Sequence, residues 1–188
     1  MTTARLAPLS QLSRYVVPPT EGEVYDYLPE TMIGRLRNLP SFAGILAFDK
    51  WTCNADGHQA AFWNRRGERK FTASLIDQGC CFNAGEWSFP DAPLRGVFGR
   101  NDVYAGITGW ESFEPRLSRI ENFPDSSLWP LVDQIPPEWY DSAVGELERL
   151  LTLLLERRSR LRDLIRSFKN SSRNPFPNWS QVTACITA

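Results

Sequence analysis

The segment 41–79 constrains the fold of this chain more than any other part of its sequence. Large apolar residues recur at helical spacing up to about Cys53, which predicts a helix with Ser41 as its N-cap. A polar loop containing Asp56 follows, and aromatic and β-branched residues then predict a β-hairpin over 59–77. Because the two ends of a hairpin meet, this order brings the acidic loop close to the end of the second strand.

Two carboxylates in this layout meet the needs of phosphoryl transfer. One carboxylate orients an attacking hydroxyl and accepts its proton, and the other holds a magnesium ion. Asp56 lies in a loop, whereas Asp77 ends a strand and precedes Gln78-Gly79, where glycine permits a sharp turn. The same pattern also fits two solvated loop aspartates, and a lone histidine such as His58 more often has a structural role.

Composition excludes several classes of protein. The chain has 188 residues, a net charge of −1 and 42% hydrophobic residues, which predicts one domain with a real core and gives no support for nucleic-acid binding. Four cysteines without C-x-x-C spacing and one histidine argue against zinc, so we expect reduced thiols in a cytoplasmic protein. The sequence shows neither a signal peptide nor an apolar run that could span a bilayer, so we expect no membrane association.

The N-terminal half predicts additional elements around this segment. We expect a lead-in over 1–13, a short strand at 15–17 and a helix over 30–39 that Pro40 ends. The loop 78–93 carries three large aromatic residues, so we expect it to pack over the site.

The C-terminal half predicts helices. Short helical pieces are followed by one long helix over about 141–168, which we expect to cap the core, and by a loose tail over 170–188. Arginines line the polar side of the long helix, as a solvated face or as a surface for nucleic acid: Arg157, Arg158, Arg160, Arg162 and Arg166. The expected class is α+β and mostly helical.

Two sequences around the acids carry a resemblance to a known family. The stretch FDKWTCNADGHQ (48–59), followed by LIDQGCCFN (75–83), resembles the HipA-like kinase family, and NAGEWSFPD (83–91) and GWESF (109–113) look like marks of a bacterial subgroup. The resemblance covers most of the chain and defines an expected domain over 14–169. It implies a protein-kinase-like fold, of which this chain matches the C-terminal lobe with its catalytic-loop hairpin and long C-terminal helix.

The resemblance also implies roles for particular residues. Asp56 takes the position of the catalytic base and Asp77 that of the magnesium ligand, while Asn54 and His58 match supporting residues of the catalytic loop. The family's second loop asparagine, a metal ligand, falls on Ala61 here, which has no ligand atom. The nearest amide, Gln59, is the candidate replacement, both for the metal and for the nucleotide.

A second departure concerns the phosphates of ATP. No glycine-rich loop precedes Asn54, and neither Lys50 nor Lys70 is placed like the nucleotide lysine of a kinase. The expected function is therefore ATP- and Mg²⁺-dependent phosphoryl transfer to a Ser/Thr or small-molecule hydroxyl, with the N-terminal lobe absent from this chain and the isolated chain inactive. The alternative is a non-catalytic kinase-like remnant or interaction module.

The same reasoning predicts partners. A partner bearing the N-terminal lobe, or an antitoxin-like protein, would cover the face where nucleotide and N-lobe meet. Without such a partner we expect exposed aromatic residues on that face, near Tyr15, Tyr25, Phe62 and Phe82, and self-association of the chain.

Overall fold

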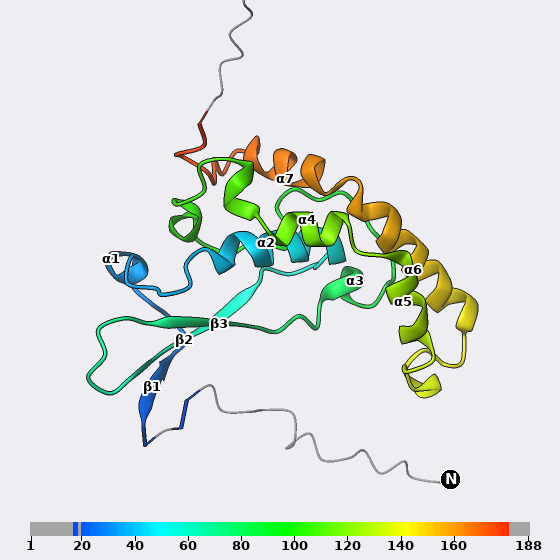
Figure 1. Ribbon diagram of the computed structural model, residues 1–188, viewed down its shortest axis with the longest axis horizontal. Coiled ribbons are helices and arrows are strands. Elements are labelled where there is room, and N and C mark those ends of the chain that lie inside the picture. The colour runs from blue at the N-terminus through cyan, green and yellow to red at the C-terminus, as the bar shows by residue number, and fades with distance from the viewer. Residues whose placement is uncertain (1–16, 19, 181–188) are drawn as a thin grey trace, which may run out of the picture.

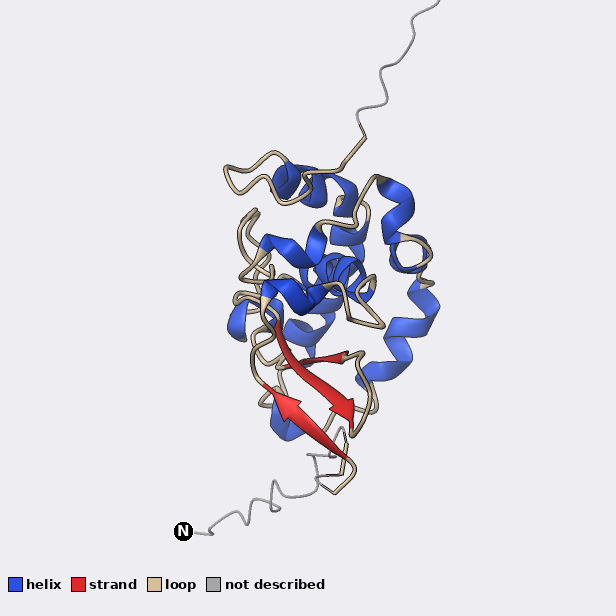
Figure 2. Ribbon diagram, turned by 90° about the vertical axis from the view of Figure 1, so that its left-hand side faces the viewer, coloured by secondary structure: helices blue, strands red, loops and turns tan. Residues whose placement is uncertain are grey.

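The computed structural model describes residues 17–18 and 20–180, and nothing is said below of the structure of the others. Within these residues the chain forms an α+β fold in which helices surround α2 and a small antiparallel sheet forms a separate layer at one end (Figures 1 and 2). This confirms the expected mixed, mostly helical class. No helix in the described part of the chain is long and apolar enough to cross a membrane.

The sheet has the strand order β1-β2-β3, with β1 at Gly22–Tyr25, β2 at Gln59–Arg65 and β3 at Thr72–Ile76. The last two form the predicted hairpin, with Gln59 opposite Ile76. The first strand of the sheet among the described residues is not the expected one at 15–17: Val17 lies in a bend, and Tyr15 and Val16 are outside the described residues. The first strand is β1 instead, which forms one edge of the sheet. Tyr25 pairs there with the aromatic Phe62 of β2, and Gly22 fits tightly against Asn64.

The helices follow the hydrophobic pattern, with shorter pieces than the sequence suggested. The α-helices are α1 (Glu30–Ile33), α2 (Ser41–Thr52), α3 (Cys81–Ala84), α4 (Arg116–Glu121), α5 (Asp125–Val132), α6 (Val144–Arg158) and α7 (Leu161–Lys169). Short 3₁₀ helices are η2 (Asn101–Tyr104), η3 (Trp110–Phe113) and η4 (Pro137–Trp139).

Helix α2 is the centre of the molecule, as its position among α4, α6 and α7 in Figure 1 shows. Its side chains are buried almost all round, which is typical of a helix enclosed by other elements. Ser41 is the first helical residue and makes no capping hydrogen bond, so its prediction as N-cap was wrong; Pro40 holds that position. The helix ends where predicted, because Cys53 adopts a left-handed conformation with φ of 53°.

The predicted helix over 30–39 is only one turn long. After α1, Leu36 forms a bridge with Phe71, and the amide of Arg37 donates a hydrogen bond to the Phe71 carbonyl. The side chain of Asn38 adds two hydrogen bonds to the backbone of Ala73. The chain therefore runs along β3 and covers part of that edge instead of continuing as a helix.

The predicted long C-terminal helix is broken into α6 and α7. The break at 159–160 lets the second helix turn and follow α2, and tight i to i−3 hydrogen bonds close the turn. Arg157 does not lie on a solvated face as expected: it is 5% exposed and its guanidinium bonds to backbone carbonyls of the core.

Residues 170–180 are not a loose tail. Phe176 is 4% exposed and packs edge-on against Tyr104 and Phe168. Trp179 stacks on Phe176, and the amide of Ser180 donates a hydrogen bond to the Thr108 carbonyl. The apolar area of these rings outweighs the polar composition that suggested a tail.

Candidate functional site

The loop that follows α2 is held by its own side chains. Asn54, which is 1% exposed, donates from its amide nitrogen to Asp49 Oδ1 at 3.2 Å and accepts the Asp56 backbone N–H at 3.1 Å. Asp56 is exposed, and its Oδ1 accepts the N–H of Gly57 at 2.7 Å. The loop thus presents the Asp56 carboxylate to solvent on a rigid base.

The second acid lies at the same end of the hairpin. Since Gln59 opens β2 opposite the end of β3, Asp77 lies next to it, and the Gln59 amide donates to Asp77 Oδ2 at 3.4 Å. Asp77 has φ of 59°, a left-handed conformation that is uncommon for a residue other than glycine and is typical of functional sites.

Backbone hydrogen bonds join the two acidic loops. The amide of Ala55 donates to the Cys80 carbonyl, and the amide of Asn83 donates to the Cys53 carbonyl, both at 2.9 Å. The structure therefore brings together the loops of Asp56 and Asp77, with Asn54 beneath the first loop and Gln59 against Asp77.

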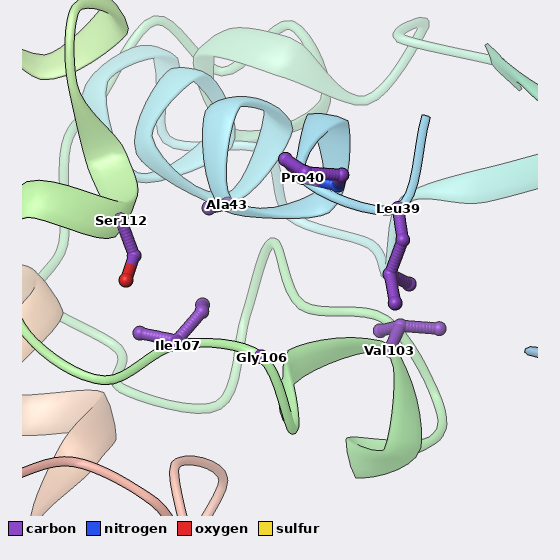
Figure 3. A pocket seen from close by; sticks show the side chains of 7 residues that line it. All are labelled: Leu39, Pro40, Ala43, Val103, Gly106, Ile107 and Ser112. Carbon is purple, nitrogen blue, oxygen red and sulfur yellow. The ribbon is translucent and has the colours of Figure 1, made fainter. Parts of the chain in front are cut away.

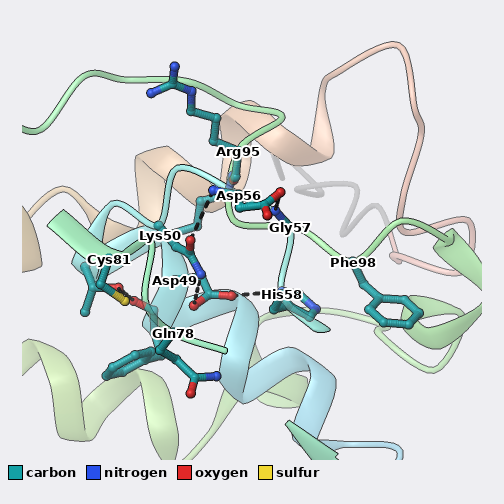
Figure 4. Close-up of polar contacts among 12 residues, drawn as sticks. Asp49, Lys50, Asp56, Gly57, His58, Gln78, Cys81, Arg95 and Phe98 are labelled. Atoms are coloured by element: carbon teal, nitrogen blue, oxygen red, sulfur yellow. Dashed lines mark hydrogen bonds and ion pairs between the residues drawn. The ribbon is translucent and has the colours of Figure 1, made fainter. Parts of the chain in front are cut away.

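A buried chain of polar contacts beneath the loop was not anticipated. His58 Nδ1 lies 2.9 Å from Asp49 Oδ2 (Figure 4). His58 Nε2 lies 3.2 Å from the Tyr104 hydroxyl. The Tyr104 hydroxyl in turn accepts the N–H of Phe98 at 2.8 Å. Both side chains of the Asp49–His58 pair are fully buried, so His58 supports the loop from inside and does not face solvent. The signal for Asp49 was its charge within an otherwise apolar helical run.

A third loop lies against Asp56. The amide of Gly96 donates to the Asp56 carbonyl at 3.0 Å, and a Cβ at position 96 would lie 2.9 Å from Cβ of Asp49, so only glycine fits there without displacement. Lys50 fixes this loop, since its ammonium group donates to the carbonyls of Pro93 and Arg95. Burial, and secondly the charge of Arg157, lower the pKa of Lys50 to about 7.

Arg157 ties the same region to α6. Its Nε donates to the carbonyl of Lys50 at 2.8 Å and its Nη1 to that of Phe89 at 3.0 Å. Burial lowers the pKa of Arg157, and Asp91, which also pairs with Arg160, offsets part of this effect. Neither candidate lysine lies where it could bind phosphates at this site. Lys50 is buried, and Lys70 is exposed beyond the turn at the other end of the hairpin.

A pocket of about 450 Å³ opens beside Gln59. Its wall includes Tyr25, Tyr27 and Ala61, and Arg100 is its one cationic residue, stacked 4.7 Å from the Tyr27 ring. This volume lies in the range of small-molecule sites. Arg100 was not predicted from the sequence, because the loop that carries it is distant from the acidic loops along the chain.

The exposure of aromatic residues near this pocket differs from the expectation. Tyr25 and Tyr27 are 36% and 58% exposed, whereas Phe62 is 1% exposed and points into the core. Phe82 is partly buried and packs near Phe89 against the core, whereas loop 78–93 was expected to pack over the site. Tyr15 lies outside the described residues.

The residues around the acids limit the kind of metal site. In the described part of the chain no group of three His, Cys, Asp or Glu side chains could hold a metal, and Ala61 offers no ligand. Asp77 and the amide of Gln59 form a donor set that fits a magnesium ion only when phosphate oxygens and water complete its coordination.

A second pocket lies away from the acids. It encloses about 190 Å³ between the start of α2 and the η2–η3 connection, and Figure 3 shows its apolar walls, with Ser112 as the one polar side chain among them. It contains no titratable group and no link to the acidic loops.

No protein-family model, curated protein or solved structure matches this chain.

Proposed function

We propose that this chain is the C-terminal lobe of a HipA-like, protein-kinase-like phosphotransferase, acting with ATP and Mg²⁺ on a Ser/Thr or small-molecule hydroxyl. The observation that carries the proposal is the pairing of the Asp56 and Asp77 loops at one end of the hairpin, beside a pocket of about 450 Å³. Phosphoryl transfer requires positioned carboxylates and little covalent chemistry from the protein.

The proposed roles follow from exposure and position. Asp56, exposed on a rigid loop, orients the attacking hydroxyl and accepts its proton. Asp77 and Gln59 are the residues that would hold Mg²⁺, which when bound neutralises charge on the phosphates. Asn54 and His58 fix the loop from below, and Arg100 is the cation of the pocket wall.

A non-catalytic interaction module is the second candidate. It is favoured by Ala61 in the place of a metal ligand, and by the lack of a lysine for the phosphates in the described residues. Turnover by this chain would then require phosphate-binding groups from outside those residues, supplied by a partner that bears an N-lobe or by an antitoxin-like protein. We propose accordingly that the isolated chain has little or no kinase activity.

A thermal-shift titration with Mg-ATP tests nucleotide binding by this lobe. We expect a stabilisation that requires Mg²⁺ and is lost in Asp77→Ala, while Asp133→Ala, an exposed acid on another face, leaves it unchanged. Absence of any shift with Mg-ATP would reject the claim that the chain alone holds nucleotide.

The base assignment needs a separate measurement. If a partner restores phosphorylation, Asp56→Asn should abolish it while the Mg-ATP thermal shift remains, because this change removes the proton acceptor and keeps the fold. Activity that survives Asp56→Asn unchanged would remove Asp56 from the mechanism.

A further inference from the structure

A third cleft, separate from the two pockets described above, belongs to no part of the proposed site. It has a volume of about 500 Å³ and is formed where the segment after α3 meets the connection between η4 and α6. Its walls carry three aromatic and three acidic residues and no lysine or arginine: Trp87, Trp139, Tyr140, Glu86, Asp141 and Glu146.

One aromatic residue of this cleft is unusually exposed, while Trp87 and Tyr140 beside it are half-buried. Trp139 is 77% exposed, the most exposed large apolar side chain in the described part of the chain. A soluble surface rarely leaves such a ring uncovered beside others unless a partner covers it.

Two other tryptophans, Trp110 and Trp179, have cationic side chains over their rings. Trp110 is covered by the guanidinium groups of Arg162 and Arg166, at 5.1 and 5.9 Å from its ring, and Trp179 by the ammonium group of Lys169 at 5.5 Å. Within residues 20–180, neither Trp87 nor Trp139 has a cation over its ring. No lysine or arginine of the described chain lines the cleft, and the nearest paired cation is Arg149, in an exposed pair with Glu146.

The carboxylates of the cleft are only weakly engaged by the protein itself. Glu86 accepts a hydrogen bond from the Asn83 amide at 2.8 Å, and Glu146 lies 3.7 Å from Arg149 in an exposed pair. Asp141 has no ion pair among the described residues. Glu146 also lies in the first turn of α6, where a carboxylate offsets the positive end of the helix dipole.

We propose that this cleft binds an arginine side chain presented by a peptide segment of a partner protein. A guanidinium group stacks flat on aromatic rings and pairs with carboxylates at its edge, and the cleft offers both kinds of contact. The open shape and volume fit an extended peptide better than a single small cation. The inference is independent of the proposed phosphotransferase activity.

The test uses the full chain with ¹⁵N-labelled tryptophan indoles and a short arginine-containing peptide. Matched peptides carry lysine, which keeps the charge, or citrulline, which keeps the shape without the charge. We expect the arginine peptide to shift the Trp87 and Trp139 indole signals, the lysine peptide to bind more weakly and the citrulline peptide not to bind.

Variants assign the binding to this cleft. Trp139→Leu should weaken binding by about fivefold, and the combined change Glu86→Gln, Asp141→Asn, Glu146→Gln should weaken it at least as much. Trp129→Leu, which removes another exposed tryptophan outside the cleft, is the matched control and should bind like the parent. Circular dichroism checks that each variant is folded.

Three results would overturn the inference. They are equal binding of the arginine and citrulline peptides, no binding of the arginine peptide, or binding that both cleft variants leave intact. If the indole signals instead depend on protein concentration without peptide, and Trp139→Leu removes that dependence, the occupant is a second copy of this chain and the separate partner is rejected.

Discussion

At the scale of single residues, the site depends on a carboxylate that never meets solvent. One carboxylate oxygen of Asp49 contacts His58, and the other accepts a hydrogen bond from the amide of Asn54. Asp49 therefore joins α2 to both ends of the loop that presents Asp56. A buried acceptor with fixed partners restricts the loop more strongly than exposed contacts could.

Asp49→Asn and Asp56→Asn make the same chemical change in opposite surroundings. We expect Asp49→Asn to lower the free energy of unfolding by about 1–3 kcal/mol, because it disturbs a buried hydrogen-bonded group. Asp56→Asn should stay within about 0.5 kcal/mol of the parent, because its carboxylate is exposed. Urea unfolding at neutral pH compares them, and equal midpoints would contradict the support role of Asp49.

Lys50 predicts a pH dependence of stability. Its folded pKa is lowered to about 7 from 10.5, so between these values the unfolded chain binds the proton that the folded chain has released. Stability therefore rises with pH across this window, by up to about 1.4 kcal/mol per pH unit from this group. Burial raises the pKa of Cys53 and Cys81, which acts in the opposite sense as the unfolded thiols ionise.

Comparison of the parent with Lys50→Met isolates the contribution of Lys50 to this pH dependence. Lys50→Met should remove this rise, measured as the change in urea midpoint between pH 7 and pH 9, while Lys70→Met, on the exposed turn, should leave it in place. Parallel pH profiles for the parent and Lys50→Met would show that Lys50 remains protonated in the folded state.

At the scale of elements, the break between α6 and α7 has a purpose in packing. Arg157, at the end of α6, turns inward and satisfies the carbonyls of Lys50 and Phe89, while α7 changes direction and lays Phe168 on the core. One straight helix could not do both.

Arg157→Ala should be far more damaging than Arg160→Ala. The first change leaves buried carbonyls without a donor, at an expected cost of about 2 kcal/mol or more, whereas Arg160 is 57% exposed and should cost less than about 0.5 kcal/mol. Chemical denaturation measures both, and hydrogen exchange in 89–95 should increase only in Arg157→Ala. Similar costs for the two arginines would contradict this assignment.

Local patterns predicted most of these elements. The helix at 41–52 and the hairpin at 59–76 follow from side-chain periods of the sequence. The break at 159–160 was not predicted, because Leu154 and Leu161 keep the helical spacing across it and Arg157 beside it contacts a carbonyl 107 positions away. The burial of 175–176 depends in the same way on distant rings, such as that of Tyr104.

At the scale of the whole molecule, apolar surface gathers around the pocket and the edge of the sheet. Val24 and Tyr27 are 53% and 58% exposed, and Ile76, on the same pocket wall, is 42% exposed. Together they form a surface suited to association.

We therefore expect the chain to self-associate as its concentration rises. Val24→Glu combined with Tyr27→Glu should reduce the effect by placing charges on that surface, whereas Leu94→Glu, equally exposed but elsewhere, should not. Light scattering over a hundredfold concentration range provides the measurement. A monodisperse parent at every concentration would refute the expectation.

The composition of the site was only partly predictable at this scale. Asp56 and Asp77 stand out in the sequence because each follows a regular element and has a glycine one or two positions further on. Tyr104 and Arg100 do not, because their position near the acids depends on how loops from different parts of the chain pack together.

The central position of α2 also has a consequence during synthesis, because α2 is made before the helices that enclose it. A ribosome completes 41–79 well before it reaches Arg157, and at about 5–20 residues per second the delay is roughly 4–16 s. Throughout that interval the apolar helix and its acidic loop lack the side chains that later enclose them. We therefore expect a nascent chain that ends before α6 to expose apolar surface and to be prone to aggregation.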